Sequence, residues 1–159
     1  MSAEVHLYTD GAAKGNPGPG GYGVVLELVG QPYRKEFYEG FRLTTNNRME
    51  LLAVIVGLEK LKKPMTKVLV ISDSKYVVDS VSKGWVFGWE KKGFAGKKNP
   101  DLWERFLKIY RQHHVAFQWV KGHNNHPQNE RCDQLAVMGS QMANLSVDVF
   151  YEREEGKLL

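Results

Sequence analysis

The sequence has little of several features that mark particular classes of protein. It contains one cysteine, Cys132, among 159 residues, so no internal disulfide is possible, which indicates a reducing compartment. No uninterrupted apolar run approaches the length of a membrane-spanning helix, and the N-terminus lacks the basic and long apolar regions of a signal peptide. Internal repeats, low-complexity tracts and dividing linkers are also missing. We therefore expect a cytoplasmic protein without a membrane segment.

The composition that remains is ordinary for a folded domain. Charged residues make up 25% of the chain and apolar residues 42%, as in soluble globular proteins, and a chain of this length can bury a genuine core. A net charge of +4 permits a polyanionic partner, but it carries little weight alone because many basic proteins have none. We expect a single domain over residues 1–145, followed by a tail, residues 146–159, to which we assign no role.

Alternating apolar residues predict three consecutive strands in the first third of the chain. Residues 5–10 alternate, residues 22–28 alternate again after a turn rich in glycine and proline, and a reversal at residues 30–32 leads into a strand with aromatic residues on one face. Strands joined by turns form an antiparallel meander. Polar capping residues at 44–50 then precede an apolar run, residues 51–58, which predicts a helix covered on more than one side.

The remainder of the chain alternates between strands and helices. A continuous apolar run at residues 68–71 predicts a strand buried on both faces, and a helix follows Ser74. Residues 85–98, hereafter the basic segment, mix tryptophans and lysines with glycines, and another helix starts at Asn99. A fifth strand carries Val115, Phe117 and Trp119. The last helix has a predicted buried face of Cys132, Leu135, Ala136, Gly139 and Ala143. This order predicts an α/β fold, a five-stranded mixed sheet with its first three strands antiparallel and helices on both faces.

Four acidic residues occupy positions where functional sites form in such folds. Asp73 follows the buried strand, at the carboxyl end where ligand sites gather. Asp10 ends the first strand, which can lie beside it, because a β-α-β crossover normally returns next to earlier strands. Glu50 opens the long helix, and Asp133 lies at the margin of the last helix's buried face. Carboxylates gathered in one place repel each other, and divalent cations usually stabilise them. Magnesium, which prefers oxygen ligands, suits such a site better than zinc.

Each acidic residue also has a purely structural explanation. Glu50 follows Asn47 by three positions and could complete a capping box. Asp73 could cap the next helix, and Asp133 could be a solvated helix residue. Periodicity does not show that the four side chains meet.

Four stretches of sequence together resemble the type 1 ribonuclease H family. They are Tyr-Thr-Asp-Gly at residues 8–11 with Gly-Asn-Pro-Gly-Pro-Gly-Gly-Tyr-Gly at 15–23, Thr-Thr-Asn-Asn-Arg-Met-Glu-Leu at 44–51, Ser-Asp-Ser-Lys-Tyr-Val at 72–77, and Trp-Val-Lys-Gly-His-Asn-Asn-His-Pro-Gln-Asn-Glu-Arg-Cys-Asp at 119–133. A lone Asp-Gly would mean little. Four such motifs in order, each with its acidic residue, are highly specific, and the resemblance extends through about Ala143.

The resemblance implies a reaction and a set of catalytic residues. The family cleaves the RNA strand of RNA–DNA hybrids and leaves 5′-phosphate and 3′-hydroxyl ends. By resemblance, Asp10, Glu50, Asp73 and Asp133 hold two Mg²⁺ ions, with Mn²⁺ as a possible substitute, and Asp10 bridges them. In such sites the ions lie roughly 3.5–4 Å apart and clamp the attacking and leaving oxygens of an in-line displacement. His123 matches a loop histidine thought to assist proton movement or product departure.

His123 has two alternative explanations. It could be an ordinary loop histidine, or it could bind zinc with His126 and Cys132. Zinc is disfavoured because a structural zinc site takes four ligands, and only three candidates lie near each other in the sequence.

The resemblance also implies how the substrate is held. Recognition rests on backbone shape and on the 2′-hydroxyl that separates RNA from DNA. Asn16, Asn46 and Asn47 match substrate-binding positions, and those of Asn16 and Asn47 contact RNA sugars. Thr45 and Asn99 match positions that bind a phosphate of the DNA strand. In the basic segment, Trp85, Lys91 and Lys92 match groups that pack on deoxyribose or pair with phosphates. The alternative is a solvated basic loop over an aromatic core, with Trp89 in that core.

Two positions depart from the family's pattern. Lys75 stands where glutamine is frequent, which puts an amide contact to the hybrid in doubt. Leu43 stands where an arginine often assists the phosphate pocket, and Arg42 would point to the other face of its strand. We expect a weaker phosphate grip with catalysis retained.

Two other functions are compatible with the same pattern. A DNA nuclease or resolvase of the same fold would use the same acidic site, although the asparagines at sugar positions and the basic segment argue against it. A non-catalytic hybrid-binding module would leave four intact acidic positions unexplained. We therefore expect a monomeric enzyme whose partner is an RNA–DNA hybrid.

Overall fold

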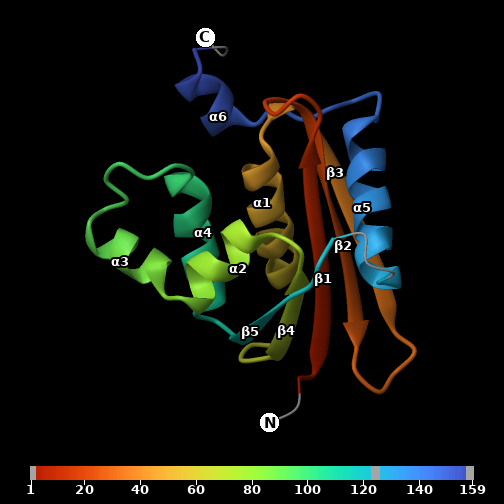
Figure 1. Ribbon diagram of the computed structural model, residues 1–159. Helices are drawn as coiled ribbons and strands as arrows, with labels where there is room; N and C mark the ends of the chain where they lie inside the picture. Colours follow the sequence, from red (N-terminus) through yellow and green to blue (C-terminus); the bar gives the residue numbers. More distant parts are fainter. Residues whose placement is uncertain (1–2, 123–125, 157–159) are drawn as a thin grey trace.

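The computed structural model describes residues 3–122 and 126–156 and contains a five-stranded mixed sheet (Figure 1). The strands are β1 Val5–Ala13, β2 Gly18–Leu28, β3 Arg34–Thr44, β4 Lys67–Ser72 and β5 His114–Trp119. Their order in the sheet is β3-β2-β1-β4-β5, with β1 to β3 antiparallel and β4 parallel to both β1 and β5. The predicted fold class is confirmed.

Helices cover both faces of this sheet. They are α1 Asn46–Glu59, α2 Lys75–Ser82, α3 Trp85–Lys91, α4 Pro100–Tyr110, α5 Pro127–Ser140 and α6 Val149–Glu154. Figure 1 shows α1 on one face, with α2 to α4 beyond it, and α5 on the other. Within the described part of the chain, no helix combines the length and apolar character needed to cross a membrane.

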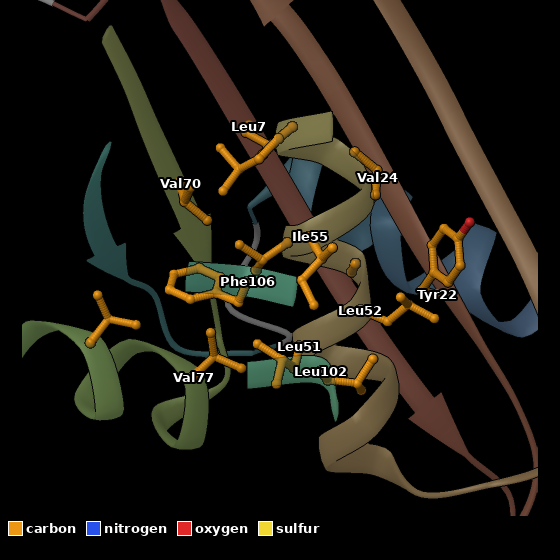
Figure 2. Close-up of a cluster of buried hydrophobic side chains, with 14 of the residues drawn as sticks. Leu7, Tyr22, Val24, Leu51, Leu52, Ile55, Val70, Val77, Leu102 and Phe106 are labelled. Carbon is orange, nitrogen blue, oxygen red and sulfur yellow. The ribbon is translucent and has the colours of Figure 1, made fainter. Parts of the chain in front are cut away.

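The central helix α1 is buried on nearly all sides, as its sequence predicted. Its N-terminus is capped by Thr45, whose Oγ1 accepts a hydrogen bond of 3.2 Å from the Arg48 N–H. Leu51 and Ile55 are completely buried. Figure 2 shows Leu51, Leu52 and Ile55 of α1 packed between the strands and the helices beyond, together with Leu7, Tyr22, Val24, Val70, Val77, Leu102 and Phe106. This core fixes the start of α1 beside the end of β1.

The second face of the sheet depends on glycines in β2 and β3. A Cβ on Gly23 would lie 2.2 Å from the Cys132 carbonyl oxygen, and one on Gly40 would lie 1.8 Å from the Gly139 oxygen. These glycines therefore let α5 pack directly against the backbone of the sheet. The predicted turn after Asp10 is shorter than expected, because β1 continues to Ala13 and β2 begins at Gly18.

The C-terminal part of the chain differs from the prediction in two respects. Helix α5 ends at Ser140, and Ala143 is exposed, so its predicted place on the buried face is wrong. Beyond the helix, Ser146 forms a β-bridge with Phe41 of β3. Helix α6 then packs beside β3, where Arg42 makes two hydrogen bonds of 2.9 and 2.8 Å to the Glu152 carboxylate.

Candidate active site

Three of the four predicted carboxylates meet at one end of the sheet. Asp10 lies in β1, Glu50 in the second turn of α1, and Asp73 directly after β4. The parallel register pairs Thr9 with Ser72, so the residues that follow emerge side by side. One ligand oxygen from each carboxylate lies within 4.8 Å of the other two. Among the described residues, no other group of three such ligands is this close.

Gly11 connects the first two carboxylates. Its N–H donates to Asp10 Oδ1 at 2.9 Å and to Glu50 Oε1 at 2.7 Å. A Cβ at this position would lie 2.3 Å from the Met49 carbonyl carbon and 2.4 Å from the Glu50 nitrogen. The absence of a side chain therefore lets β1 contact the backbone of α1 and places Glu50 beside Asp10.

Gly11→Ala is expected to lower the free energy of unfolding by about 1–3 kcal/mol, because the added methyl group would force β1 and α1 apart. Cleavage should fall as well, because the same displacement separates Asp10 from Glu50. Urea denaturation measures the first effect. The matched control is Gly88→Ala in α3, where a Cβ meets nothing within 4 Å and which should leave stability unchanged or raise it by up to about 1 kcal/mol. Equal stability in the two variants would contradict the role assigned to Gly11.

The structural explanations for two carboxylates do not hold. Thr45 is the N-cap of α1 and Ser74 is the N-cap of α2. A capping box would put its acidic residue at the third helical position, and in α1 that position is Arg48, not Glu50. Glu50 and Asp73 are therefore free of capping roles.

The electrostatics of this cluster disfavour three ionised carboxylates without a counter-charge. Burial is the largest cause that raises the pKa of Asp10, followed by the negative charge of Asp73. Burial and then the charges of Asp10 and Asp73 raise the pKa of Glu50 well above its ordinary value. A cation bound among these oxygens would reverse both effects.

The oxygens also have the chemistry of a divalent-cation site. Asp73 Oδ1 is buried and has no hydrogen-bond partner in the described structure, which is rare for a buried polar atom. Carboxylate oxygens are the ligands that Mg²⁺ and Mn²⁺ prefer. The donor set therefore fits a hard divalent cation.

Asp133 lies near this group without joining it. It is half-buried on α5, and its charge contributes to raising the pKa of Asp10. His123 lies outside the described residues. The proposed zinc partners serve other purposes: His126 Nδ1 accepts from the Asn129 N–H at 3.3 Å, and the buried Cys132 belongs to the core.

The predicted substrate residues outside the basic segment gather around the start of α1. Asn16 Oδ1 accepts from the Asn46 N–H at 2.9 Å, and Asn46 Oδ1 accepts from the Ala13 N–H. The Asn46 side chain thus ties the β1–β2 turn to the helix. A cavity of about 650 Å³ lies beside it, lined by Asn16, Thr45, Asn47, Arg48, Lys97, Lys98, Asn99 and residues of α6.

Asn99 lies at the edge of this cavity and makes two side-chain hydrogen bonds. Its backbone is left-handed, with φ 62°, a conformation that asparagine adopts more readily than most residues. Its amide nitrogen donates to the Tyr76 hydroxyl at 3.0 Å, and its Oδ1 accepts from Arg48 at 3.3 Å. Arg48 and Lys97 were not predicted as parts of this site, although Arg48 lies within the motif that contains Glu50.

Part of the basic segment is helical, and its lysines are exposed as predicted. It contains α3, and Lys91 and Lys92 are exposed at the end of that helix. Trp85 is 47% exposed. Trp89 packs edge-on against Trp103 at 5.9 Å between ring centroids, so the aromatic-core alternative is correct for this residue.

The two departures from the family's pattern have different surroundings. The Lys75 ammonium lies 4.9 Å from the centre of the Trp119 ring, and Trp119 Nε1 donates to the Asp73 carbonyl oxygen at 3.0 Å. Lys75 therefore packs on Trp119, an aromatic residue that the sequence suggested only as part of a strand and that contacts the backbone of Asp73. Arg42 pairs with α6 and, like Leu43, does not line the Asn99 cavity.

A mixed α/β sheet with three carboxylates gathered where β1, β4 and α1 meet is compatible with a class of proteins that bind divalent cations. Comparison with known proteins gives the family. The RNase H family model matches residues 2–141. Ribonuclease H of Desulforamulus reducens is 56% identical over 151 residues, which cover 92% of this chain and 93% of that protein. The chain therefore belongs to the ribonuclease H family and is a hydrolase; the general activity of this family is cleavage of RNA–DNA hybrids.

Solved structures agree with this assignment. LC9-RNase H1, described as a type 1 RNase H with the type 2 active-site motif, matches with a TM-score of 0.77 and 30% identity over 99% of this chain and 83% of its own. LC11-RNase H1, solved in complex with an RNA/DNA hybrid, matches with a TM-score of 0.62 and 28% identity over 84% of this chain and 94% of its own.

Proposed function

We propose that this protein hydrolyses the RNA strand of RNA–DNA hybrids by a two-Mg²⁺ mechanism and leaves 5′-phosphate and 3′-hydroxyl ends. The observation that carries the proposal is the convergence of Asp10, Glu50 and Asp73 within 4.8 Å. Together with Asp133, these residues would hold the ions. Bound Mg²⁺ would supply Lewis-acid chemistry to an in-line displacement at a phosphodiester. Mn²⁺, which accepts the same oxygen ligands, is the expected substitute.

The chain's own groups prepare that chemistry. The Gly11 N–H fixes the orientation of Asp10 and Glu50 through hydrogen bonds to both. Asp73 presents a buried oxygen without a partner. By resemblance, His123 would move a proton or help the product leave. An imidazole suits this role because histidine side chains generally titrate near neutral pH.

Substrate choice would depend on the residues around the start of α1. Asn16 and Asn47 would contact RNA sugars, and Thr45 and Asn99 would hold a phosphate of the DNA strand in the cavity they line with Lys97 and Lys98. The similar protein LC11-RNase H1 was solved in complex with an RNA/DNA hybrid, which supports a hybrid as the substrate. We further propose a monomeric, cytoplasmic enzyme with a catalytic domain of residues 1–145, against which Ser146 and α6 of the C-terminal tail pack.

Hybrid binding should weaken steeply with salt, because Lys91 and Lys92 are exposed and would pair with phosphates and release counterions. The double change Lys91→Ala, Lys92→Ala should reduce the slope of log Kd against log salt by roughly one for each lysine. Fluorescence anisotropy with a labelled hybrid measures the slope, in an Asp10→Asn background to prevent cleavage. Lys108→Ala, an exposed lysine of α4, is the control. If the double variant left the slope unchanged, the basic segment would not be part of the interface with the hybrid.

The deciding experiment for the function uses three duplexes of one sequence. RNA–DNA, RNA–RNA and DNA–DNA substrates, each labelled on either strand, are incubated with the protein and Mg²⁺ and resolved on a sequencing gel. Cleavage confined to the RNA strand of the hybrid, with products that a 5′-phosphate-dependent exonuclease degrades, is the expected result. Cleavage of the DNA duplex would instead indicate a resolvase-like enzyme, and hybrid binding without cleavage would indicate a non-catalytic module.

A further inference from the structure

The side chain of Asn99 does not do what an asparagine at its position usually does. Asn99 is the N-cap of α4, and an asparagine there normally accepts a hydrogen bond from a backbone N–H of the first helical turn. Here the cap makes no side-chain hydrogen bond to its own helix. The amide is bonded instead to Arg48 of α1 and to Tyr76 of α2. Its orientation is therefore set by groups outside the helix that it begins.

These two partners determine which way the Asn99 amide faces. A guanidinium donates hydrogen bonds and accepts none, so the atom that lies 3.3 Å from Arg48 Nη1 is the amide oxygen. The amide nitrogen then faces the Tyr76 hydroxyl, at 3.0 Å. The opposite orientation would turn the amide N–H groups toward the guanidinium and would lose the bond to Arg48. Arg48 is itself held by Asp101 and Asp148, so one side of the amide is fixed by a charged network.

The Tyr76 hydroxyl, on the other side of the amide, is held by a buried tryptophan. Trp103 is completely buried, and its Nε1–H, which can only donate, lies 2.9 Å from the Tyr76 oxygen. The two rings also pack together, with 5.7 Å between their centroids. The Tyr76 oxygen thus accepts from Trp103 and from Asn99 at the same time. This bond connects the Asn99 amide to the core.

The arrangement leaves one amide hydrogen of Asn99 available. An asparagine nitrogen carries two hydrogens. One is bonded to Tyr76, and the other has no hydrogen-bond partner among residues 3–122 and 126–156. Asn99 lines the cavity in which a phosphate of the DNA strand would bind. A donor that is oriented before the ligand arrives loses less conformational freedom on binding than a mobile one.

We propose that Tyr76 is a positioning residue for the phosphate of the DNA strand, because its hydroxyl holds the Asn99 amide with the remaining N–H directed at the phosphate. The role rests on the proposed function, since it requires a hybrid whose DNA strand lies beside Asn99. Tyr76 is not part of the cavity lining and acts through Asn99. Without the hydroxyl, only Arg48 would hold the amide, and ordering it around a phosphate would cost more entropy.

The hydroxyl has to be separated from the structural contribution of the ring. Tyr76 is partly buried and packs against the main core, so the ring stabilises the fold in any case. Tyr76→Phe keeps the ring and removes only the oxygen, although it leaves Trp103 Nε1 without its acceptor and should lower stability to some degree. Val77→Ala is the matched control. Val77 is the next residue of α2, is completely buried and takes no part in the hydrogen bonds of Asn99.

Hybrids that carry a single neutral methylphosphonate in the DNA strand test the proposal. The modification is moved along the strand one linkage at a time, and binding is measured by fluorescence anisotropy in an Asp10→Asn background. At the linkage that occupies the cavity, it should weaken binding by about tenfold, as expected for lost hydrogen bonds to a charged group. In Tyr76→Phe the same linkage should matter by less than about threefold, because the contact is already weakened. Val77→Ala should retain the full effect, even if it unfolds at a lower urea concentration than Tyr76→Phe.

Kinetics on the unmodified hybrid, with Asp10 intact, provide a second readout. Tyr76→Phe should raise KM by about five- to tenfold and keep kcat within about twofold of wild type, because it weakens binding without changing the carboxylates. The double variant Tyr76→Phe, Asn99→Ala should bind the hybrid no more weakly than Asn99→Ala alone, since both changes remove the same contact.

The possible failures are distinguishable. Full sensitivity of Tyr76→Phe to the methylphosphonate, or additive losses in the double variant, would overturn the positioning role and leave the proposed function intact. If the Asp10→Asn protein bound the hybrid but no linkage were sensitive, the phosphate site would be wrong, and the role of Tyr76 with it. A wild-type protein that neither bound nor cleaved the hybrid would overturn the proposed function on which this role rests.

Discussion

Asp10→Asn is expected to lower cleavage of the hybrid by at least about a thousandfold. The side chain belongs to the cluster in which Glu50 and Asp73 each place an oxygen within 4.8 Å of an Asp10 oxygen. Replacing one carboxylate oxygen by an amide removes charge from the cation site, and the loss of several kcal/mol of transition-state stabilisation corresponds to about three powers of ten in rate. Single-turnover cleavage of an RNA–DNA hybrid in Mg²⁺ measures the effect.

The same substitution should not damage the fold. Because burial and the charge of Asp73 raise the pKa of Asp10, the ionised side chain destabilises the folded state at neutral pH, and a neutral amide removes that cost. Asp10→Asn should therefore unfold in urea at the same or a higher concentration than wild type when a chelator is present. Cleavage close to the wild-type rate would contradict the proposed mechanism, whereas a large loss of stability would show that Asp10 has a structural role.

Arg48→Ala is expected to cost about 3–5 kcal/mol of unfolding free energy. The Arg48 side chain is 3% exposed and donates hydrogen bonds to Asp148 at 2.7 and 2.9 Å and to Asp101 at 2.9 and 2.7 Å. Removing it leaves the Asp148 carboxylate buried without its counter-charge, although Thr44 still donates to it at 2.7 Å. For a chain of this size the loss corresponds to roughly 10 °C in Tm.

An exposed ion pair provides the control for this variant. Arg105 donates to Glu59 at 2.8 and 2.6 Å, but its side chain is 47% exposed, so Arg105→Ala should cost less than about 1 kcal/mol. Arg48→Ala should also raise the KM for the hybrid, because Arg48 holds Asn99 at the cavity edge. Similar urea midpoints for the two variants would contradict the importance assigned to burial.

Periodicity predicted most of the fold because each element has a clear apolar pattern. The strand at residues 68–71 and the helix over residues 51–58 are both continuous apolar runs, and both are buried as expected except at the half-buried Leu69 and Val56. Errors arose where packing overrides local signals. Gly18 and Gly20 suggest a turn, but they lie in β2, in a strand whose other glycines let α5 approach.

The site was predictable only in part. Asp10, Glu50 and Asp73 are far apart in the sequence, and their meeting depends on the parallel register of β1 with β4 and on contact between Gly11 and α1. Neither feature is visible in residue spacing, so the prediction depended on a resemblance to a family. Capping alternatives for Glu50 could not be decided until Thr45 was seen to cap α1.

No local sequence pattern predicted the ion-pair network around Arg48. Its partners lie 53 and 100 residues away along the chain, and Asp148 falls in the region that was expected to be a tail. Residues 146–152 instead pack beside β3 and complete the buried network. Polar residues that depend on distant partners cannot be recognised from local pattern, because in isolation they look like solvated charges.

The most direct test of the carboxylate cluster is the effect of Mg²⁺ on unfolding. If Asp10, Glu50 and Asp73 hold the cation, Mg²⁺ at about 100 times its Kd should stabilise the wild-type protein by about 2.7 kcal/mol relative to a chelator. Asp10→Asn should lose most of this stabilisation, while Lys108→Ala should keep it. Equal stabilisation of wild type and Asp10→Asn by Mg²⁺ would contradict the assignment of this cluster as the metal site.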